Sequence, residues 1–366
     1  MSLAVISGGC GGSGSSSPSN HEEILRSMTL EEKVGQIFII CTEQLDTAPA
    51  VDGVKSEDKK LTAAMIETLK KYPAGGFIIM RNNIENPEQL KKLTADLKAS
   101  CRIAPIIAVD EEGGRVARIA NHGSFDVPKY ESMEAIGDTG DPENAYEAAS
   151  TIGGYIKEYG FTMDFAPVAD INTNPENIVI GNRAFGSEPE LVSRMVSAYL
   201  DGLHSQGIAG SMKHFPGHGD TQADTHSGYV AVYKTWDELM SAELIPFIDN
   251  FGFADSVMVA HITLKNITVD NLPATLSKEL ITGRLRGELG YNGAVITDAL
   301  NMGAIHENYS SAESAVLAFE AGNDILLIPY DYREAFDAVL EAVRSGRISE
   351  ERLNDSVRRI LALKNI

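Results

Sequence analysis

Residues 105–110 read PIIAVD, a continuous apolar run that ends in a carboxylate. Because the run lacks polar alternation, it is typical of a strand that is covered on both faces. Seven similar runs, flanked by Gly, Pro or Asn, are VGQIFII (34–40), GGFIIM (75–80), FTMDFAPV (161–168), IAGSMKH (208–214), SVMVAHI (256–262), GAVITD (293–298) and DILLIP (324–329). Eight such strands, separated by stretches long enough for helices, predict an α/β fold consisting of one (β/α)₈ barrel.

The stretches between the runs carry helix signals. Thr29 and Glu32 have the spacing of a capping box at the start of a helix. Apolar residues line one face of two further segments, at Leu191, Met195, Tyr199 and Leu203 before Gly207, and at Leu353, Val357, Ile360 and Leu361 near the carboxyl end. A doubly wound open sheet is the structural alternative, but the first run is not followed by the glycine-rich turn of that fold, and eight strands favour closure.

Composition narrows the functional classes. The 366 residues include 31 Lys and Arg against 52 Asp and Glu, a net charge of -21 that repels nucleic acid and anionic membrane surfaces. Three cysteines, Cys10, Cys41 and Cys101, form neither a disulfide framework nor a metal-binding spacing. No apolar run is long enough to span a bilayer. We therefore expect neither a nucleic-acid partner nor a membrane-spanning segment.

The amino-terminal residues have a different composition. Residues 4–19 read AVISGGCGGSGSSSPS, a short apolar remnant, one cysteine and a Gly/Ser tether. This resembles the junction of a bacterial lipoprotein, with Cys10 as the lipidated residue, although a disordered leader or tag is the alternative. We expect residues 1–20 to be a disordered tether and residues 21–366 to be the catalytic barrel domain.

Most of the unusual polar residues follow a strand-like run directly, at the end where barrel enzymes build their active sites. They are Asp110, Glu111, Glu112 and Arg115; Asp164 and Asp170; Lys213 and His214; His261; and Asp298. Each one alone is compatible with a helix cap or a solvated loop charge. Their convergence on one rim predicts a functional site.

The densest polar stretch is KHFPGHGDTQADTH, residues 213–226. Its Gly and Pro content indicates a loop, and its His and Asp spacing matches no compact zinc pattern, so we expect no metal. Asp224 can instead hold an imidazole nitrogen of His226 and fix its tautomer, which suits a general acid and base. Asp298 could stabilise an oxocarbenium ion from the opposite face, or it could cap a helix that begins near Ala299.

Four stretches together resemble the family 3 glycoside hydrolases, and within them the bacterial NagZ-type β-N-acetylglucosaminidases. They are VDEEGGRVARI (109–119), DFAPVADINTNPENIVIGNRAF (164–185), KHFPGHGDTQADTH (213–226), and the region 258–302 with MVAHI, ATLS, LRGELGYNG and VITDALNM. The match covers most of residues 21–330. We consider the spacing of KHFPGHG from the D-T-H triplet very specific.

The resemblance implies roles for individual residues. Asp298 would be the catalytic nucleophile and His226 the acid/base, oriented by Asp224. Five residues would bind the terminal N-acetylglucosamine through its hydroxyls, namely Asp110, Arg118, Arg183, Lys213 and His214. His218 and His261 would have structural roles. Most glycosidases use two carboxylates, so the histidine is a departure.

The implied activity is retaining hydrolysis of terminal N-acetylglucosamine from peptidoglycan fragments, without a cofactor. The partner would be a small saccharide or muropeptide, with membrane contact only through a lipid on Cys10. A lipidated protein would lie in the bacterial cell envelope, and an unlipidated one in the cytoplasm. Two alternatives stay open at this stage: a phosphorylase of the same fold, and a surface sugar-binding protein without catalysis.

Overall fold

A closed parallel β-barrel forms the centre of the computed structural model, which describes residues 20–46, 59–221 and 230–364. Its eight strands are neighbours in the order β11-β9-β7-β6-β3-β2-β1-β12. Their bounds are β1 Phe38–Ile40, β2 Gly76–Ile78, β3 Ile106–Val109, β6 Met163–Asp164, β7 Ala209–Phe215, β9 Ser256–Val259, β11 Ala294–Thr297 and β12 Leu326–Leu327. A parallel bridge between Ile296 and Ile325 joins the two ends of the sheet. The predicted (β/α)₈ barrel is confirmed, with one strand in each predicted run.

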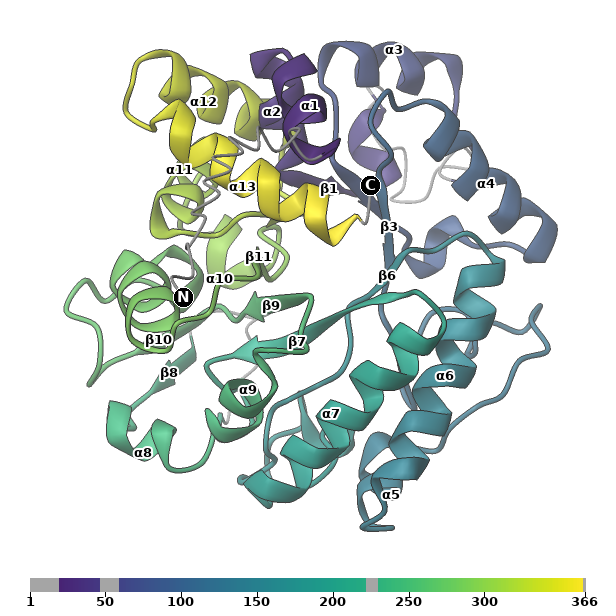
Figure 1. Ribbon diagram of the computed structural model, residues 1–366, viewed down its shortest axis with the longest axis vertical. Helices are drawn as coiled ribbons and strands as arrows, with labels where there is room; N and C mark the ends of the chain where they lie inside the picture. The colour runs from purple at the N-terminus through teal and green to yellow at the C-terminus, as the bar shows by residue number, and fades with distance from the viewer. Residues whose placement is uncertain (1–19, 47–58, 222–229, 365–366) are drawn as a thin grey trace, which may run out of the picture.

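Helices surround the barrel (Figure 1). They are α1 Asn20–Ser27, α2 Leu30–Gln36, α3 Ala63–Lys71, α4 Pro87–Ala99, α5 Met133–Gly137, α6 Pro142–Glu158, α7 Pro189–Ser205, α8 Trp236–Met240, α9 Ile245–Asn250, α10 Gly303–His306, α11 Ser311–Ala321, α12 Tyr332–Arg344 and α13 Glu350–Leu363. Between β9 and β11 the outer helix is a π-helix, η6 Glu279–Glu288. None of the described helices is long and apolar enough to cross a bilayer.

Local sequence signals account for several helix boundaries and buried faces. Thr29 and Glu32 form the predicted capping box at the start of α2, with both reciprocal hydrogen bonds present. On α7, Met195, Tyr199 and Leu203 are fully buried, as the apolar periodicity predicts. Gly207 follows this helix with a φ of +72°, a conformation that glycine adopts without strain.

One predicted run holds the end of a helix as well as a strand. The run at 34–40 begins inside α2, which extends to Gln36, and strand β1 begins only at Phe38. The apolar stretch continues across the end of the helix because the last turn of α2 and the following strand are both buried. Gly35 permits this packing, since a Cβ there would lie 2.2 Å from the carbonyl oxygen of Pro73.

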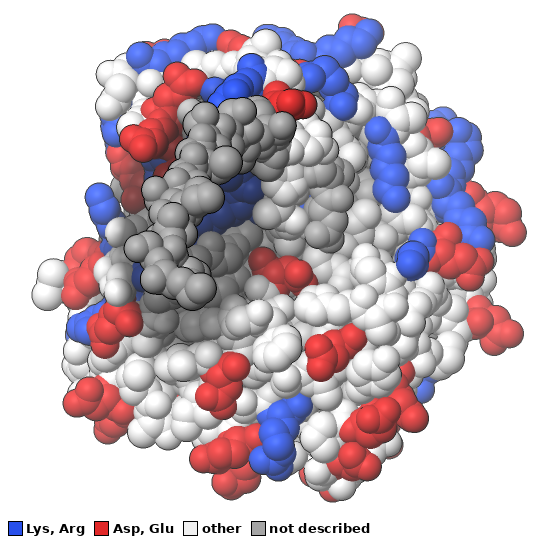
Figure 2. Space-filling view, in the orientation of Figure 1, with Lys and Arg blue, Asp and Glu red and all other residues white. Residues whose placement is uncertain are grey.

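Small elements lie in the connections that follow the strands. A two-stranded antiparallel sheet pairs β4 (Glu111–Gly113) with β5 (Val116–Ala117), and a parallel pair joins β8 (Val230–Val232) to β10 (Ile262–Leu264). Short 3-10 helices are η1 Thr42–Leu45, η2 Arg81–Asn83, η3 Gly181–Arg183 and η5 Ala274–Leu276. Figure 2 shows Lys and Arg side chains interspersed with Asp and Glu on the visible face of the molecule.

Candidate active site

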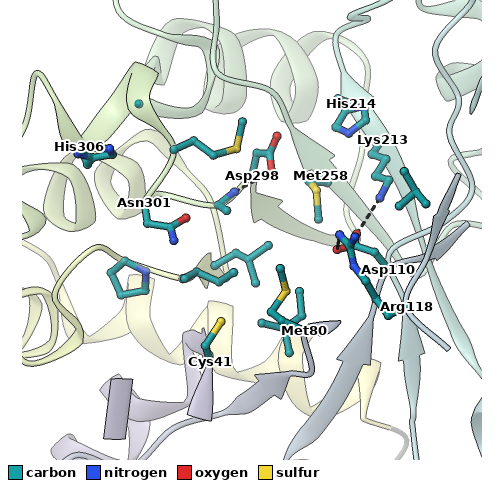
Figure 3. Close-up of a pocket in the computed structure, with 18 of the residues that line it drawn as sticks. Cys41, Met80, Asp110, Arg118, Lys213, His214, Met258, Asp298, Asn301 and His306 are labelled. Carbon is teal, nitrogen blue, oxygen red and sulfur yellow. Dashed lines mark hydrogen bonds and ion pairs between the residues drawn. The ribbon is translucent and has the colours of Figure 1, made fainter. Parts of the chain in front are cut away.

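A cavity of about 710 Å³ lies at the carboxyl ends of the barrel strands (Figure 3). Its described lining includes six of the residues singled out from the sequence, namely Asp110, Arg118, Arg183, Lys213, His214 and Asp298. They come from loops and strands spread over nearly 190 positions of the chain, and the barrel brings them to one rim. Asp224 and His226 lie outside the described residues.

Asp110 follows β3 and sits between two cations. Its Oδ1 lies 3.0 Å from Nζ of Lys213, and its Oδ2 accepts a hydrogen bond of 3.0 Å from Nη2 of Arg118. Burial alone would raise the pKa of Asp110, but the positive charges of Lys213 and Arg118 outweigh that effect and lower it. Asp110 is therefore an ionised acceptor at neutral pH. The structure places this carboxylate, the lysine and the arginine together, as the resemblance implies.

Glu112 is the second carboxylate of this network. It accepts hydrogen bonds from Nε and Nη2 of Arg183 at 2.8 and 2.7 Å, and its Oε1 lies 2.5 Å from Nζ of Lys213. Burial would raise the pKa of Glu112, but Arg183 and Lys213 lower it strongly. The two carboxylates thus share Lys213, and three cationic side chains contact them, those of Arg118, Arg183 and Lys213.

A tight hairpin positions Glu112. Gly113 and Gly114 adopt φ values of +92° and +59°, and they turn the chain from β4 into β5. Glu111 points the other way, where it accepts hydrogen bonds of 2.8 Å from the backbone N–H groups of Ile119 and Ala120. Our sequence-based set of binding residues omitted Glu112, although strand alternation could have found it. Residues two apart in an extended chain share a face, so Glu112 follows Asp110 toward the site.

Asp170 extends the network to two histidines. Its Oδ2 accepts a hydrogen bond of 2.7 Å from Nδ1 of His214, and its Oδ1 accepts one of 2.7 Å from the backbone N–H of His218. Nε2 of His214 lies 3.4 Å from Nη2 of Arg183. Asp170 fixes the orientation of the His214 ring. Our set of site residues omitted it as well, since it lies 44 positions from His214 in the chain.

His218 contacts both the loop and the cavity. Its Nδ1 lies 2.8 Å from Oγ1 of Thr221, and the same hydroxyl lies 2.9 Å from the carbonyl oxygen of His218. Its Nε2 is buried and has no hydrogen-bond partner in the part of the chain that the structure describes. The ring itself is held firmly by Thr221. This loop contact is compatible with the structural role expected for this histidine.

Asp298 follows β11 and its carboxylate lies within the cavity (Figure 3). Its backbone N–H donates to the carbonyl of Val259 at 2.9 Å, and its Oδ1 accepts a hydrogen bond of 2.7 Å from the N–H of Ala299. Burial would raise the pKa of Asp298, but His261 and His214 outweigh it and lower the pKa. The helix-cap alternative is wrong, because the next helix, α10, begins at Gly303 and has Met302 as its N-cap.

His261 supports the backbone beside Asp298. It is fully buried, its Nδ1 lies 2.7 Å from Oγ1 of Thr275, and its Nε2 donates to the carbonyl of Ala299 at 2.9 Å. Since the N–H of Ala299 binds the Asp298 carboxylate, His261 fixes the peptide that orients this carboxylate. The structural role expected for His261 agrees with these contacts. Within the described ranges, no group of three or more His, Cys, Asp or Glu residues could hold a metal ion.

Comparisons with known proteins identify the family. The model of the glycosyl hydrolase family 3 N terminal domain matches residues 29–363. Beta-hexosaminidase A of Pseudoalteromonas piscicida is 32% identical over 330 residues, and the match covers 83% of this chain but only 55% of that protein. The beta-hexosaminidase of Stenotrophomonas maltophilia is 33% identical over 295 residues, which cover 79% of this chain and 86% of that protein.

A solved structure also indicates glycosyl hydrolase family 3. The family 3 beta-N-acetylglucosaminidase from Paenibacillus sp. str. FPU-7 superimposes with a TM-score of 0.83 and 40% sequence identity, covering 93% of this chain and 62% of that chain. The family inferred from the four sequence stretches is thus confirmed, as is the barrel inferred from the eight apolar runs. The two relatives are named beta-hexosaminidases, and the solved structure is named a beta-N-acetylglucosaminidase. This chain belongs to glycosyl hydrolase family 3.

Proposed function

We propose that the protein is a retaining β-N-acetylglucosaminidase that removes N-acetylglucosamine from the non-reducing end of its substrate. The main support is the arrangement in the cavity, where the ionised Asp298 carboxylate shares one space with the Asp110–Lys213–Glu112–Arg183 network. Such a network presents paired donors and acceptors to vicinal sugar hydroxyls. The names of the relatives supply the sugar, an N-acetylhexosamine.

The network still has hydrogen-bonding capacity for a sugar. No described residue accepts from Nε of Arg118, although Nη2 of this residue is bound to Asp110. Each carboxylate oxygen can accept more than one hydrogen bond, and Nζ of Lys213 has three donors. Because Asp110 and Glu112 are held by cations, binding a sugar requires little rearrangement of these side chains. This preorganisation lowers the cost of binding.

The proposed reaction has two displacement steps. A carboxylate oxygen of Asp298 forms a bond to the anomeric carbon while the bond from that carbon to the leaving oxygen breaks. His226, assigned from the sequence, donates a proton to the leaving oxygen, and Asp224 holds the imidazole. In the second step His226 removes a proton from water, which attacks the anomeric carbon and releases Asp298. The lowered pKa of Asp298 suits it to the role of nucleophile.

We further propose that the natural substrates are peptidoglycan fragments in which N-acetylglucosamine is β-1,4-linked to a muramic acid residue. This proposal rests on the resemblance to the NagZ-type enzymes. A lipid on Cys10 would place the protein in the cell envelope, where it would meet wall fragments, and without it the protein would act in the cytoplasm. Mass measurement of the native protein distinguishes the two, because an acylated Cys10 adds the mass of its lipid.

Paired chromogenic substrates test the activity. We expect the wild-type protein to release 4-nitrophenol faster from the N-acetyl-β-glucosaminide than from the β-glucoside. His226→Ala should lose less activity on these substrates than on a natural disaccharide, since 4-nitrophenol leaves without protonation. Preference for the glucoside, or a His226→Ala variant with full activity on the disaccharide, would contradict the proposal. Addition of phosphate identifies the alternative, because only a phosphorylase forms the sugar 1-phosphate.

A further inference from the structure

The cavity has a second end that the network of cations and carboxylates does not occupy. There the rings of Tyr330 and His306 stack with centroids 4.8 Å apart and an interplanar angle of 19°. Both residues line the cavity, as does Asn301. Tyr330 is 66% exposed, whereas large side chains such as Tyr332 close by are almost fully buried. The stacked pair therefore presents an aromatic surface at the cavity rim.

The backbone around Tyr330 is firmly held. The carbonyl of Pro329 accepts a hydrogen bond from the side-chain amide of Gln44, and the N–H of Asp331 donates to Oγ of Ser311 at 2.8 Å. The side chain of Asp331 caps the start of α12. These contacts on both sides fix the position of Tyr330 at the rim, although its ring is exposed.

The turn that brings Tyr330 to the cavity is strained. Ile328, which follows β12, has a φ of +42°, and a β-branched residue rarely adopts this conformation. Its N–H donates to the carbonyl of Ile39 at 2.8 Å, so pairing with the neighbouring strand holds it in place. Strained backbone of this kind occurs mostly at functional sites. Here the turn directs Pro329 and Tyr330 over the cavity, which both residues line.

The positions of the labelled side chains give a direction along the cavity. In Figure 3, Asp298 lies between Asp110, Lys213 and His214 on one side and Asn301 and His306 on the other. In a pyranose ring, C1 and C4 are at opposite ends. A sugar that binds Asp110 through its distal hydroxyls and presents C1 to Asp298 directs its glycosidic oxygen toward the other side. The group beyond the scissile bond would then extend toward the stacked pair.

We propose that Tyr330, backed by His306, forms the subsite for the sugar ring on the leaving-group side of the scissile bond. This inference rests on the proposed function, since it takes Asp298 as the nucleophile. One face of a pyranose ring carries mainly C–H groups, which pack well against an exposed aromatic face. Stacking on His306 leaves the other face of Tyr330 for the sugar. The chemical class of the ligand is a hexopyranose ring in the leaving group.

The test compares substrates with and without that ring. N,N′-diacetylchitobiose has a sugar in its leaving group, whereas methyl N-acetyl-β-glucosaminide has only a methyl group. We expect Tyr330→Ala to lower kcat/KM for the disaccharide by about tenfold, a loss equivalent to one aromatic stacking contact, and to leave the methyl glycoside unchanged. Tyr330→Phe keeps the ring and should retain activity on both substrates. Tyr233→Ala is the matched control, because Tyr233 is 68% exposed and is not among the residues that line the cavity.

If Tyr330→Ala lost kcat/KM equally on both substrates, or on neither, the proposed subsite would be overturned. A binding measurement separates this result from failure of the proposed function. Calorimetric titration of an Asp298→Asn background with the disaccharide should give a Kd about tenfold weaker when Tyr330 is replaced by Ala, whatever the turnover of the wild type. N-acetylglucosamine alone should bind both proteins equally. If the wild type releases no N-acetylglucosamine but the two disaccharide affinities differ, the hydrolase proposal fails and the subsite stands. Equal affinities for the disaccharide contradict the subsite.

Discussion

Replacing Glu112 by Gln should destabilise the protein strongly. The Glu112 side chain is 1% exposed and binds Arg183 through two hydrogen bonds of 2.7 and 2.8 Å and Lys213 at 2.5 Å. Glutamine preserves the shape but removes the charge, and its amide group can present N–H donors to the two cations. Breaking a buried ion pair from one side costs about 3–5 kcal/mol, because the remaining charge stays buried without its partner. We expect a loss of stability in this range.

Guanidinium unfolding followed by circular dichroism measures the change, with stability compared through the transition midpoint. Glu158→Gln is the matched control, because Glu158 pairs with Lys91 at the same 2.7 Å but is 64% exposed. Exposed pairs contribute little to stability, so this variant should unfold at the wild-type midpoint. If Glu112→Gln also unfolds at the wild-type midpoint, the buried network does not hold the site together.

The stability difference between wild type and Glu112→Gln should depend on pH. The pKa of Glu112 is lower in the folded state than its ordinary value of 4.5, because Arg183 and Lys213 outweigh the effect of burial. A carboxyl group with a lowered folded-state pKa stabilises the fold above its unfolded-state pKa, and this stabilisation is lost as the pH falls toward the folded-state pKa. The difference in free energy of unfolding between wild type and Glu112→Gln should therefore be largest above about pH 5, and it should decrease in more acidic solution. A difference that grows as the pH falls would contradict the lowered pKa of Glu112.

Two further variants test the geometry of the site. Asp170→Asn should lower kcat/KM by about 10²-fold with the fold retained, because His214 loses the carboxylate that orients it, and wild-type kinetics would show that this orientation is dispensable. Gly219→Ala should lower the unfolding midpoint, since a Cβ there would lie 1.7 Å from the carbonyl oxygen of Ile171, whereas Gly123→Ala has open space and should be neutral. Equal midpoints for the two alanine variants would show that the loop adapts to the added carbon.

The barrel could be predicted from the sequence because a parallel strand that is covered on both faces appears as a continuous apolar run. Seven of the eight apolar runs contain a whole barrel strand, and the run at 208–214 contains all of β7 except Phe215. The boundary at Val34–Gln36 could not be predicted, since a buried helix end and a buried strand have the same apolar composition. The π-helical geometry of Glu279–Glu288 likewise has no pattern in the sequence that we recognised.

The cavity was predicted in outline, and the links between its residues were not. Polar residues after successive strands must meet at one rim, so Asp110, Lys213 and Asp298 could be grouped from the sequence. The pairing of Asp170 with His214 depends on how two neighbouring strand ends are aligned, which spacing along the chain does not reveal. Tyr330 was missed because an isolated tyrosine after a strand gives no signal. Its exposure and its stacking on His306 emerge only in the folded chain.

In the proposed reaction Asp298 forms a covalent bond to the sugar. The most direct test incubates the protein with a fluorinated N-acetylglucosaminyl fluoride, whose glycosyl-enzyme intermediate breaks down slowly, and maps the modified peptide by mass spectrometry. We expect a mass increase equal to one sugar on the peptide that contains Asp298, and no such increase in Asp298→Asn. A sugar attached to another carboxylate such as Asp110, or turnover by Asp298→Asn at the wild-type rate, would contradict it.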